Sequence, residues 1–304
     1  MKSLFEDLKA KGFRGKLSLD EPLAAHTSWK LGGAAEIFAV PIDSKDLQLL
    51  LLLAASNAVP WLVIGNGSNL LVADTGVRGL VIYTGAMTGV RFLPDEMVEA
   101  EAGITLTQLI RVCCKKGLSG MEELLGIPGT LGGAVLMNAG ALDTEIGDLV
   151  SQVFLTDGYG EWTLRQEQID FGYRTSRLEG EGVICRALLQ LRRDDAGKLK
   201  QRCAEIQKRR RRVQRLSGAH AGSVFKNPPT EKAWQLIERA GLRGKRCGEA
   251  QFAETHCNHI LNLGGASARD VMQLIDEAKD RVAQVCGVEL ELEVCLAGWE
   301  EPKE

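Results

Sequence analysis

Long apolar runs, Cys-x-x-Cys pairs and an excess of positive charge are all missing from this sequence. The most apolar stretch, residues 47–55, is interrupted by Gln48 and is far shorter than the roughly 18 apolar residues of a membrane span. None of the eight cysteines forms a Cys-x-x-Cys pair, which disfavours a zinc site. A net charge of −3 argues against a general nucleic-acid binder or a polybasic membrane protein. We therefore predict no metal site and no nucleic-acid or membrane partner, but small-molecule partners.

The N-terminal residues lack the apolar core of an export signal. The stretch MKSLFEDLKAKG carries Glu6 and Asp7 where such a signal needs apolar side chains. The cysteines alternate with apolar residues, as small core side chains do. We therefore expect a cytoplasmic protein, and we interpret residues 47–55 as a buried helix.

Short strand-like runs alternate with helical patterns, which is typical of a mixed α and β protein. At 304 residues the chain is long enough for two or three compact units. Capping boxes at Thr105–Gln108 and Ser267–Asp270 predict two helix starts. The predicted helices cover residues 43–57, 105–116, 194–215, 231–240 and 267–286. The predicted strands cover residues 61–64, 79–83, 153–156, 183–191 and 288–296.

The predicted helix 194–215 is strongly basic and could bridge two lobes. Its run Lys208–Arg212 could release counterions on meeting a nucleic-acid phosphate. Cations also suit the negative end of a helix dipole, and no stacking aromatic residues accompany the run. A solvated helix end is the interpretation we favour, with an RNA-binding segment as the alternative.

Two glycine-rich loops favour a phosphorylated ligand. The first, GNGSN at residues 65–69, follows a predicted strand and can form a nest of N–H groups for an anion. It lacks the third glycine and the βαβ setting of a dinucleotide fingerprint, which disfavours a Rossmann domain. The second, residues 125–140, has glycines around Pro128 that let the main chain approach a flat ligand. A short buried helix should follow, with its N-terminus towards the ligand.

These loops and five further stretches together resemble the UDP-N-acetylenolpyruvoylglucosamine reductase family over most of the chain. The motifs are TSWKLGG at 27–33, GNGSNLLV at 65–72, GIPGTLGGAVLMNAGA at 126–141, FGYRTS at 171–176, AGSVFKNP at 221–228, AQFAETH at 250–256 and VELELEV at 288–294. The interval from Arg174 to Ser223 is short, which resembles the family class without an additional substrate-covering loop.

The resemblance implies an α+β fold and a flavin-dependent reduction. A two-lobed FAD-binding region of the vanillyl-alcohol-oxidase type is expected over residues 1–84 and 85–212, with an α+β substrate-binding domain over 213–304. The implied enzyme uses NADPH and FAD to reduce UDP-N-acetylglucosamine enolpyruvate to UDP-N-acetylmuramate for peptidoglycan.

The same resemblance implies the site residues. Arg174, Ser223 and Glu293 are the expected catalytic residues: a charge neighbour for the substrate carboxylate, a proton donor and a second acid. Expected substrate contacts are Tyr173, Arg174, Lys226 and Asn227. Expected FAD contacts are Gly65, Asn66, Gly67, Ser68, Asn69, Gly126, Pro128, Gly129, Thr130, Gly133, Ala134 and Asn138.

Some positions depart from the family pattern. Leu292 and Cys295 stand where Pro and Arg are usual, Leu142-Asp143 where Tyr-Gly is usual, and Ala253 and His259 where Ser and an aromatic residue are usual. Two alternatives to the reductase therefore stay open. One is a carbohydrate or alcohol oxidase of the same flavin superfamily, and the other is a nucleotide-sugar or flavin-binding protein without turnover.

Overall fold

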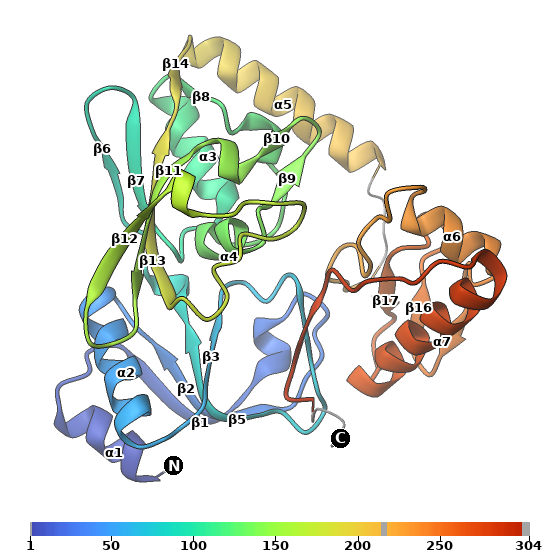
Figure 1. The fold of residues 1–304 in the computed structure, drawn as a ribbon, viewed down its shortest axis with the longest axis horizontal. Coiled ribbons are helices and arrows are strands. Elements are labelled where there is room, and N and C mark those ends of the chain that lie inside the picture. The colour runs from blue at the N-terminus through green and yellow to red at the C-terminus, as the bar shows by residue number, and fades with distance from the viewer. Residues whose placement is uncertain (1, 214–217, 300–304) are drawn as a thin grey trace. The chain divides into compact units, whose positions relative to one another are not determined.

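A computed structural model describes residues 2–213 and 218–299, and the chain divides into two compact units (Figure 1). The first unit comprises Met1–Ser18, Ile37–Asn66 and Gly79–Gln214. The second comprises Leu19–Glu36, Gly67–Arg78 and Arg215–Glu304. The three domains expected from the sequence stay a prediction.

A four-stranded sheet of order β1-β2-β5-β3 contains the first strands of the chain. Its strands are β1 (Lys16–Pro22), β2 (Ala34–Val40), β3 (Trp61–Ile64) and β5 (Val77–Tyr83), of which β3 and β5 run parallel. Helices α1 (Lys2–Ala10) and α2 (Ser44–Ser56) share an apolar core with them. Asp43 caps α2 by accepting the N–H of Asp46, so the apolar run 47–55 is the buried helix that its composition predicts.

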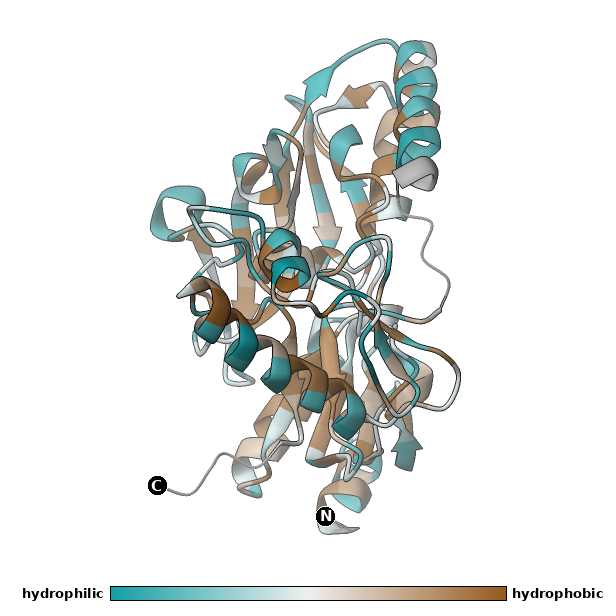
Figure 2. Ribbon diagram, turned by 90° about the vertical axis from the view of Figure 1, so that its right-hand side faces the viewer, coloured by the Kyte–Doolittle hydropathy of each residue, from teal (hydrophilic) through white to brown (hydrophobic). Residues whose placement is uncertain are grey.

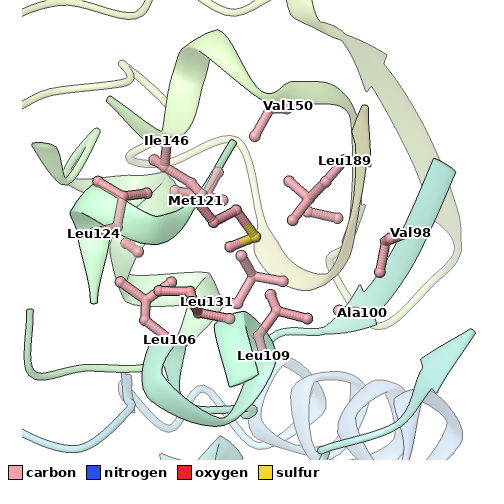
Figure 3. Packing of buried hydrophobic residues seen from close by; sticks show 14 of the residues in the cluster. Val98, Ala100, Leu106, Leu109, Met121, Leu124, Leu131, Ile146, Val150 and Leu189 are labelled. Atoms are coloured by element: carbon pink, nitrogen blue, oxygen red, sulfur yellow. The ribbon is translucent and has the colours of Figure 1, made fainter. Parts of the chain in front are cut away.

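An antiparallel five-stranded sheet of order β12-β11-β13-β7-β6 carries the larger core of the first unit. The strands are β6 (Val90–Phe92), β7 (Met97–Glu101), β11 (Val150–Thr156), β12 (Glu161–Arg165) and β13 (Val183–Gln190). Helices α3 (Leu106–Lys115), α4 (Leu131–Leu136) and α5 (Ala196–Val213) pack with this sheet around one apolar cluster. Figure 3 shows Met121 and Leu131 inside this cluster, with Leu189 and Val98 reaching it from β13 and β7. The core fixes the segments on both sides of the second glycine loop.

Short elements complete the first unit. Two-stranded pairs join β8 (Leu118–Ser119) to β14 (Arg192–Arg193) and β9 (Gly140–Ala141) to β10 (Thr144–Glu145). The 3-10 helices of the chain are η1 (Leu23–His26), η2 (Thr84–Ala86), η3 (Glu122–Leu124), η4 (Ile146–Asp148) and η5 (Gln166–Gln168).

Helix α5 is polar along most of its length, as Figure 2 shows, but it is part of the first unit's core. Leu199 and Ile206 are buried in the same cluster as α3. Arg202, one turn from Leu199 on the same face of the helix, pairs with the buried Glu122 at 2.8 Å. The expected helix extended to Arg215, and residues 214–217 lie outside the described part of the chain.

The second unit contains a small antiparallel sheet and two helices. The sheet has the order β15-β16-β17, with β15 (Arg246–Cys247), β16 (Ala250–Phe252) and β17 (Ile260–Asn262). Helix α6 (Ala233–Arg239) and the amphipathic helix α7 (Ala268–Cys286), whose turns alternate between brown and teal in Figure 2, pack with this sheet. Ser267 and Asp270 form the predicted capping box at the start of α7.

The predicted closing strand over residues 288–296 is wrong in extent. Only β18 (Cys295–Ala297) is a strand, and it pairs in parallel with β4 (Leu70–Val72). Before it, the chain bonds to a different partner: the N–H groups of Lys226 and Glu293 donate to Glu291 and Val224. The apolar alternation predicted one strand, but the chain changes hydrogen-bond partner midway, so no continuous ladder forms.

Candidate functional site

The first glycine loop begins where strand β3 ends. Ile64 is the last residue of β3, and Gly65 follows it directly. A Cβ atom on Gly65 would lie 2.3 Å from Oγ1 of Thr130, which belongs to the second glycine loop. Since this distance is too short for any Cβ atom, glycine is required for the close approach. The structure thus brings together two motifs that stand far apart in the sequence.

The second glycine loop is held by the main chain next to helix α3. The carbonyl of Gly129 accepts the N–H of Leu106 at 3.1 Å, and Thr130 forms a β-bridge with Thr105, the N-cap of α3. Gly129 has a φ of 136°, a conformation that is open to glycine but not to residues with a Cβ atom. The main chain at Gly129 and Thr130 therefore holds this part of the loop.

The two consecutive glycines at the start of α4 have different surroundings. A Cβ atom on Gly132 would lie 2.9 Å from the Cβ of Ala102, so Gly132 permits close packing. Around Gly133 only Oγ1 of Thr130, at 3.7 Å, lies within contact of such an atom. Gly133 is exposed, while Ala134 is buried in the core. Gly133 is thus the glycine with room for a ligand.

Asn138 joins the second glycine loop to the segment that carries Arg174. Its side chain is 1% exposed, and its Nδ2 donates to Glu145 at 2.7 Å and to the carbonyl of Gly172 at 2.9 Å. Its Oδ1 accepts the N–H of Gly147 at 3.0 Å. The contacts that the structure gives Asn138 are therefore structural, and a role in cofactor binding stays a prediction.

Arg174 lies in a tight turn closed by a β-bridge between Gly172 and Thr175. Its φ of 58° is a left-handed conformation that is uncommon outside glycine. The guanidinium donates to the carbonyl of Gly140 at 3.3 Å and lies 5.1 Å from the centre of the half-exposed Tyr173 ring. Two of the four side chains predicted to contact the substrate therefore lie together in the first unit.

Arg210 contacts the second glycine loop, which the sequence interpretation missed. It belongs to the basic run 208–212, but its Nη2 donates to the carbonyl of Glu123 at 3.1 Å. Its Cδ would lie 2.9 Å from a Cβ on Gly126. Burial lowers the pKa of the Arg210 guanidinium, and the charge of Arg209 adds to this. The interpretation as a solvated helix end is therefore wrong at Arg210. The charges in the sequence alone did not indicate that this side chain is partly buried.

Ser223 and Glu293 lie on neighbouring segments of the second unit. Val224, next to Ser223, accepts the N–H of Glu293 at 2.8 Å. The carbonyl of Glu293 accepts Nδ2 of Asn69 at 2.8 Å, so the end of the first glycine loop reaches the same segment. Two of the three predicted catalytic residues are therefore brought together, and Arg174 belongs to the first unit.

The structure separates the three glutamates of the closing segment. Glu289 and Glu291 are exposed, whereas Glu293 is partly buried. Glu291 pairs with Lys226 at 2.5 Å. The period of two in the sequence placed all three carboxylates alike, but the change of hydrogen-bond partner gives Glu293 a different environment.

Two asparagines hold the Ser223 segment. Asn258, which the sequence interpretation missed, accepts the N–H of Phe225 at 2.9 Å through Oδ1 and donates to the carbonyl of Phe225 at 2.8 Å through Nδ2. Its own carbonyl accepts the N–H of Val224 at 2.9 Å. Asn227, a predicted substrate contact, accepts the N–H of Ala233 at the start of α6. The main chain directly after Ser223 is thus held by these hydrogen bonds.

The positions that depart from the family pattern lie in both units. Leu142, with a φ of 57° and a 60% exposed side chain, and Asp143 connect β9 to β10. Cys295 is the exposed first residue of β18. Ala253 is buried and donates its N–H to the carbonyl of His259.

Within residues 2–213 and 218–299, no group of histidine, cysteine and carboxylate side chains has the arrangement of a metal site. No helix in the same part of the chain is long and apolar enough to cross a membrane.

The class of protein follows from the part of the chain that contains the glycine loops. Residues 35–163 match the family described as FAD binding domain. Alkyldihydroxyacetonephosphate synthase shares the fold over 64% of this chain and 44% of its own, with a TM-score of 0.50 and 20% identity. The chain thus belongs to the class of FAD-binding proteins and has an α+β fold, as the sequence predicted.

The remainder of the chain gives the family. Residues 214–297 match the C-terminal domain of UDP-N-acetylenolpyruvoylglucosamine reductase. The reductase of Heliobacterium modesticaldum is 44% identical over 291 residues, which is 95% of this chain and 93% of that protein. The crystal structure of the Thermus caldophilus reductase matches with a TM-score of 0.78 and 35% identity, over 93% of this chain and 99% of that one. The chain therefore belongs to the UDP-N-acetylenolpyruvoylglucosamine reductase family.

The glycine loops fit the flavin nucleotide that this class of protein binds. The missing side chain at Gly65 lets the first loop lie against Thr130, and the open space at Gly133 leaves the second loop free to approach a ligand. Gly65, Gly133 and Thr130 would hold the cofactor mainly through the main chain.

Proposed function

We propose that this protein reduces UDP-N-acetylglucosamine enolpyruvate to UDP-N-acetylmuramate with NADPH, in the synthesis of peptidoglycan precursors. The observation that carries the proposal is the fixed position of Ser223 beside Glu293 in a chain that also has the FAD loops of its family. Bound FAD would take a hydride from NADPH and supply it to the substrate.

Arg174 would stabilise the charge that develops during reduction. The hydride adds to the methylene carbon of the enolpyruvyl group, which moves an electron pair onto the neighbouring carbon and the carboxylate. A guanidinium stays charged and binds a carboxylate through two parallel hydrogen bonds. The turn around Arg174, closed between Gly172 and Thr175, would hold this charge in place with little motion.

Ser223 would donate its hydroxyl proton to the carbon next to the carboxylate, which completes the saturated product. A serine hydroxyl is a weak acid, so the alkoxide it leaves needs neighbouring donors. Glu293 would lie near the substrate carboxylate and share a proton with it. Tyr173, Lys226 and Asn227 would bind the rest of the substrate. Lys226, three residues after Ser223, carries a cation that is paired with the exposed Glu291.

The reaction would take place in the cytoplasm. All eight cysteines are free thiols, several of them buried, which suits a reducing compartment. Cell fractionation with an antibody against the protein tests this: a periplasmic or membrane fraction would contradict it.

An anaerobic stopped-flow experiment tests the proposed function. NADPH should bleach the flavin absorbance, and UDP-N-acetylglucosamine enolpyruvate should then restore it. The Ser223→Ala variant should slow the restoration at least 100-fold but leave the bleaching within about twofold, since only the second step needs the proton donor.

Ser56→Ala, on an exposed turn of α2, is the matched control and should behave as the parent protein. A product formed in D2O should carry one solvent deuterium on the carbon next to the carboxylate. A flavin that stays reduced when the substrate is bound would contradict the proposal, and so would restoration at the parent rate in Ser223→Ala.

A further inference from the structure

Three of the four histidines gather in the second unit beside Ser223. Nδ1 of His256 lies 2.9 Å from Nδ1 of His259, and the two rings meet edge to face with centres 4.5 Å apart. The ring of His220 packs against His259 from another side, again edge to face, at 5.3 Å. No motif spacing predicts this cluster, because its members come from two separate segments.

The three rings are suited to being neutral. Only one of the two facing Nδ1 atoms can carry a proton if they share a hydrogen bond. The pKa of His259 is lowered to about 3, chiefly by burial and to a smaller extent by the nearby titratable rings of His256 and His220. Burial also lowers the pKa of His220 and of His256, which lies against the uncharged Trp234.

The cluster is connected to the main chain on both sides of Ser223. On one side, Nδ1 of His220 accepts the N–H of Gly222 at 3.1 Å. On the other side, the N–H of Val224 donates at 2.9 Å to the carbonyl of Asn258, which lies between His256 and His259 in the sequence. The residue before Ser223 is therefore bonded to a ring of the cluster, and the residue after it to the main chain between the other two histidines.

We infer that His220 and His259 are positioning residues for Ser223, which rests on the proposed role of Ser223 as the proton donor. His220 holds the N–H of Gly222 through an unprotonated Nδ1, and His259 holds the His220 ring in place while its own ring is fixed by His256. The three together fix the direction of the Ser223 hydroxyl, and none of them has to touch the substrate.

The hydrogen bond from the Gly222 N–H requires Nδ1 of His220 to be an unprotonated acceptor. A protonated imidazole has a donor on both nitrogens and accepts nothing, so protonation of His220 releases the Gly222 N–H. An asparagine can replace the acceptor, because its side-chain oxygen readily accepts the N–H two residues further on. An alanine cannot.

Amide hydrogen exchange tests the structural half of the inference without a bound cofactor. In His220→Ala the Gly222 amide should exchange at least tenfold faster, whereas the Val224 amide should keep its protection through Asn258. His220→Asn should restore the Gly222 protection. In His259→Phe, which retains an aromatic ring, the Gly222 amide should exchange a few times faster. Unchanged Gly222 exchange in His220→Ala overturns the inference.

The two half-reactions test the functional half. His220→Ala should slow the substrate-dependent return of flavin absorbance about tenfold, leave NADPH-dependent bleaching unchanged, and leave the substrate KM within about twofold. His220→Asn should recover most of the rate. In the parent protein, this return should slow in acid, at a pH below the ordinary histidine pKa of about 6.5 because burial lowers the pKa of His220, and it should slow less in His220→Asn, whose amide does not titrate.

The matched control is His26→Gln, which changes the one histidine outside the cluster. It should match the parent protein in amide exchange and in both half-reactions. If Ser223→Ala slows the return and His220→Ala does not, the positioning role is wrong and the donor role stands. If Ser223→Ala leaves the return unchanged, the donor role itself is wrong. Should His220→Ala fail to fold, His220→Asn and His259→Phe decide by the same two measurements.

Discussion

The two glycine loops and the Ser223 segment are held in place by different means. The loops depend on their own main chain, through the bond from the Leu106 N–H to the Gly129 carbonyl and the close approach of Gly65 to the Thr130 side chain. The Ser223 segment is fixed by side chains, above all Asn258 and His220. A loop held by its own main chain, here called a main-chain cradle, needs its glycines but tolerates substitution of neighbouring side chains. A segment held by side chains, here called a side-chain clamp, loses its position when one of them is replaced.

The largest effect is expected at Asn258. Asn258→Ala leaves the buried N–H and carbonyl of Phe225 without partners, which should lower the free energy of unfolding by about 3 kcal/mol. Urea unfolding followed by fluorescence measures this. Asn57→Ala, at the C-cap of α2, should lower it by less than about 1 kcal/mol. A similar loss in both variants would contradict the idea of a side-chain clamp.

Low pH should lower the free energy of unfolding through the histidine cluster. The pKa of His259 is lowered to about 3 by burial, so the unfolded chain, with a pKa near 6.5, binds the proton first. The stabilising contribution is complete above about pH 6.5 and is lost as the pH falls towards 3. At pH 4.5 the loss should be about 2 kcal/mol relative to pH 7.5, and His259→Phe should show less of it. Equal losses in the two proteins, from urea unfolding at both pH values, would contradict this.

A larger side chain at Gly65 should disturb the main-chain cradle and weaken FAD binding. Gly65→Ala places a Cβ atom 2.3 Å from Oγ1 of Thr130, and should weaken FAD binding about 30-fold, or about 2 kcal/mol. Gly65→Ala with Thr130→Ala should recover part of the affinity, because the second change removes the clashing atom. Gly160→Ala, where nothing lies within 4 Å of the added atom, is the control. Flavin fluorescence titration gives all three affinities, and no recovery in the double variant would show that the contact is not the cause.

Arg210 combines the two cases, because its side chain contacts the second glycine loop. Arg210→Met removes the bond to the carbonyl of Glu123 beneath the second loop. It should weaken FAD binding about tenfold, or about 1.4 kcal/mol. Arg209→Met, on the exposed side of α5, should change the affinity less than twofold. Equal effects would mean that only the overall charge of the helix matters.

Local signals made much of the fold predictable. The capping boxes at Thr105 and Ser267 gave two helix starts, because such a box involves only four consecutive residues. Strands β3 and β13 were found from their apolar runs. The closing segment 288–296 was not, because its alternation is correct but its partners come from Val224 and Asn69.

Contacts between distant segments decided the rest of the site. The family motifs indicated Ser223 and Glu293, but the cluster of His220, His256 and His259 forms only when two segments fold together. In the same way, the basic run indicated a solvated helix end, while the fold turns Arg210 towards Gly126. Composition describes what a helix carries, and tertiary packing decides which of its residues are buried.

The hydrogen bonds of Asn69 predict where suppressor mutations should arise. It is the last letter of the GNGSN motif, yet its side chain donates to the carbonyl of Glu293 and its own carbonyl accepts the N–H of Cys295. From the sequence alone, a substitution of Asn69 would be interpreted as damage to the first glycine loop. Suppressor mutations that restore growth should nevertheless arise at residues 292–296, where the bonding partners of Asn69 lie, more often than among the glycines.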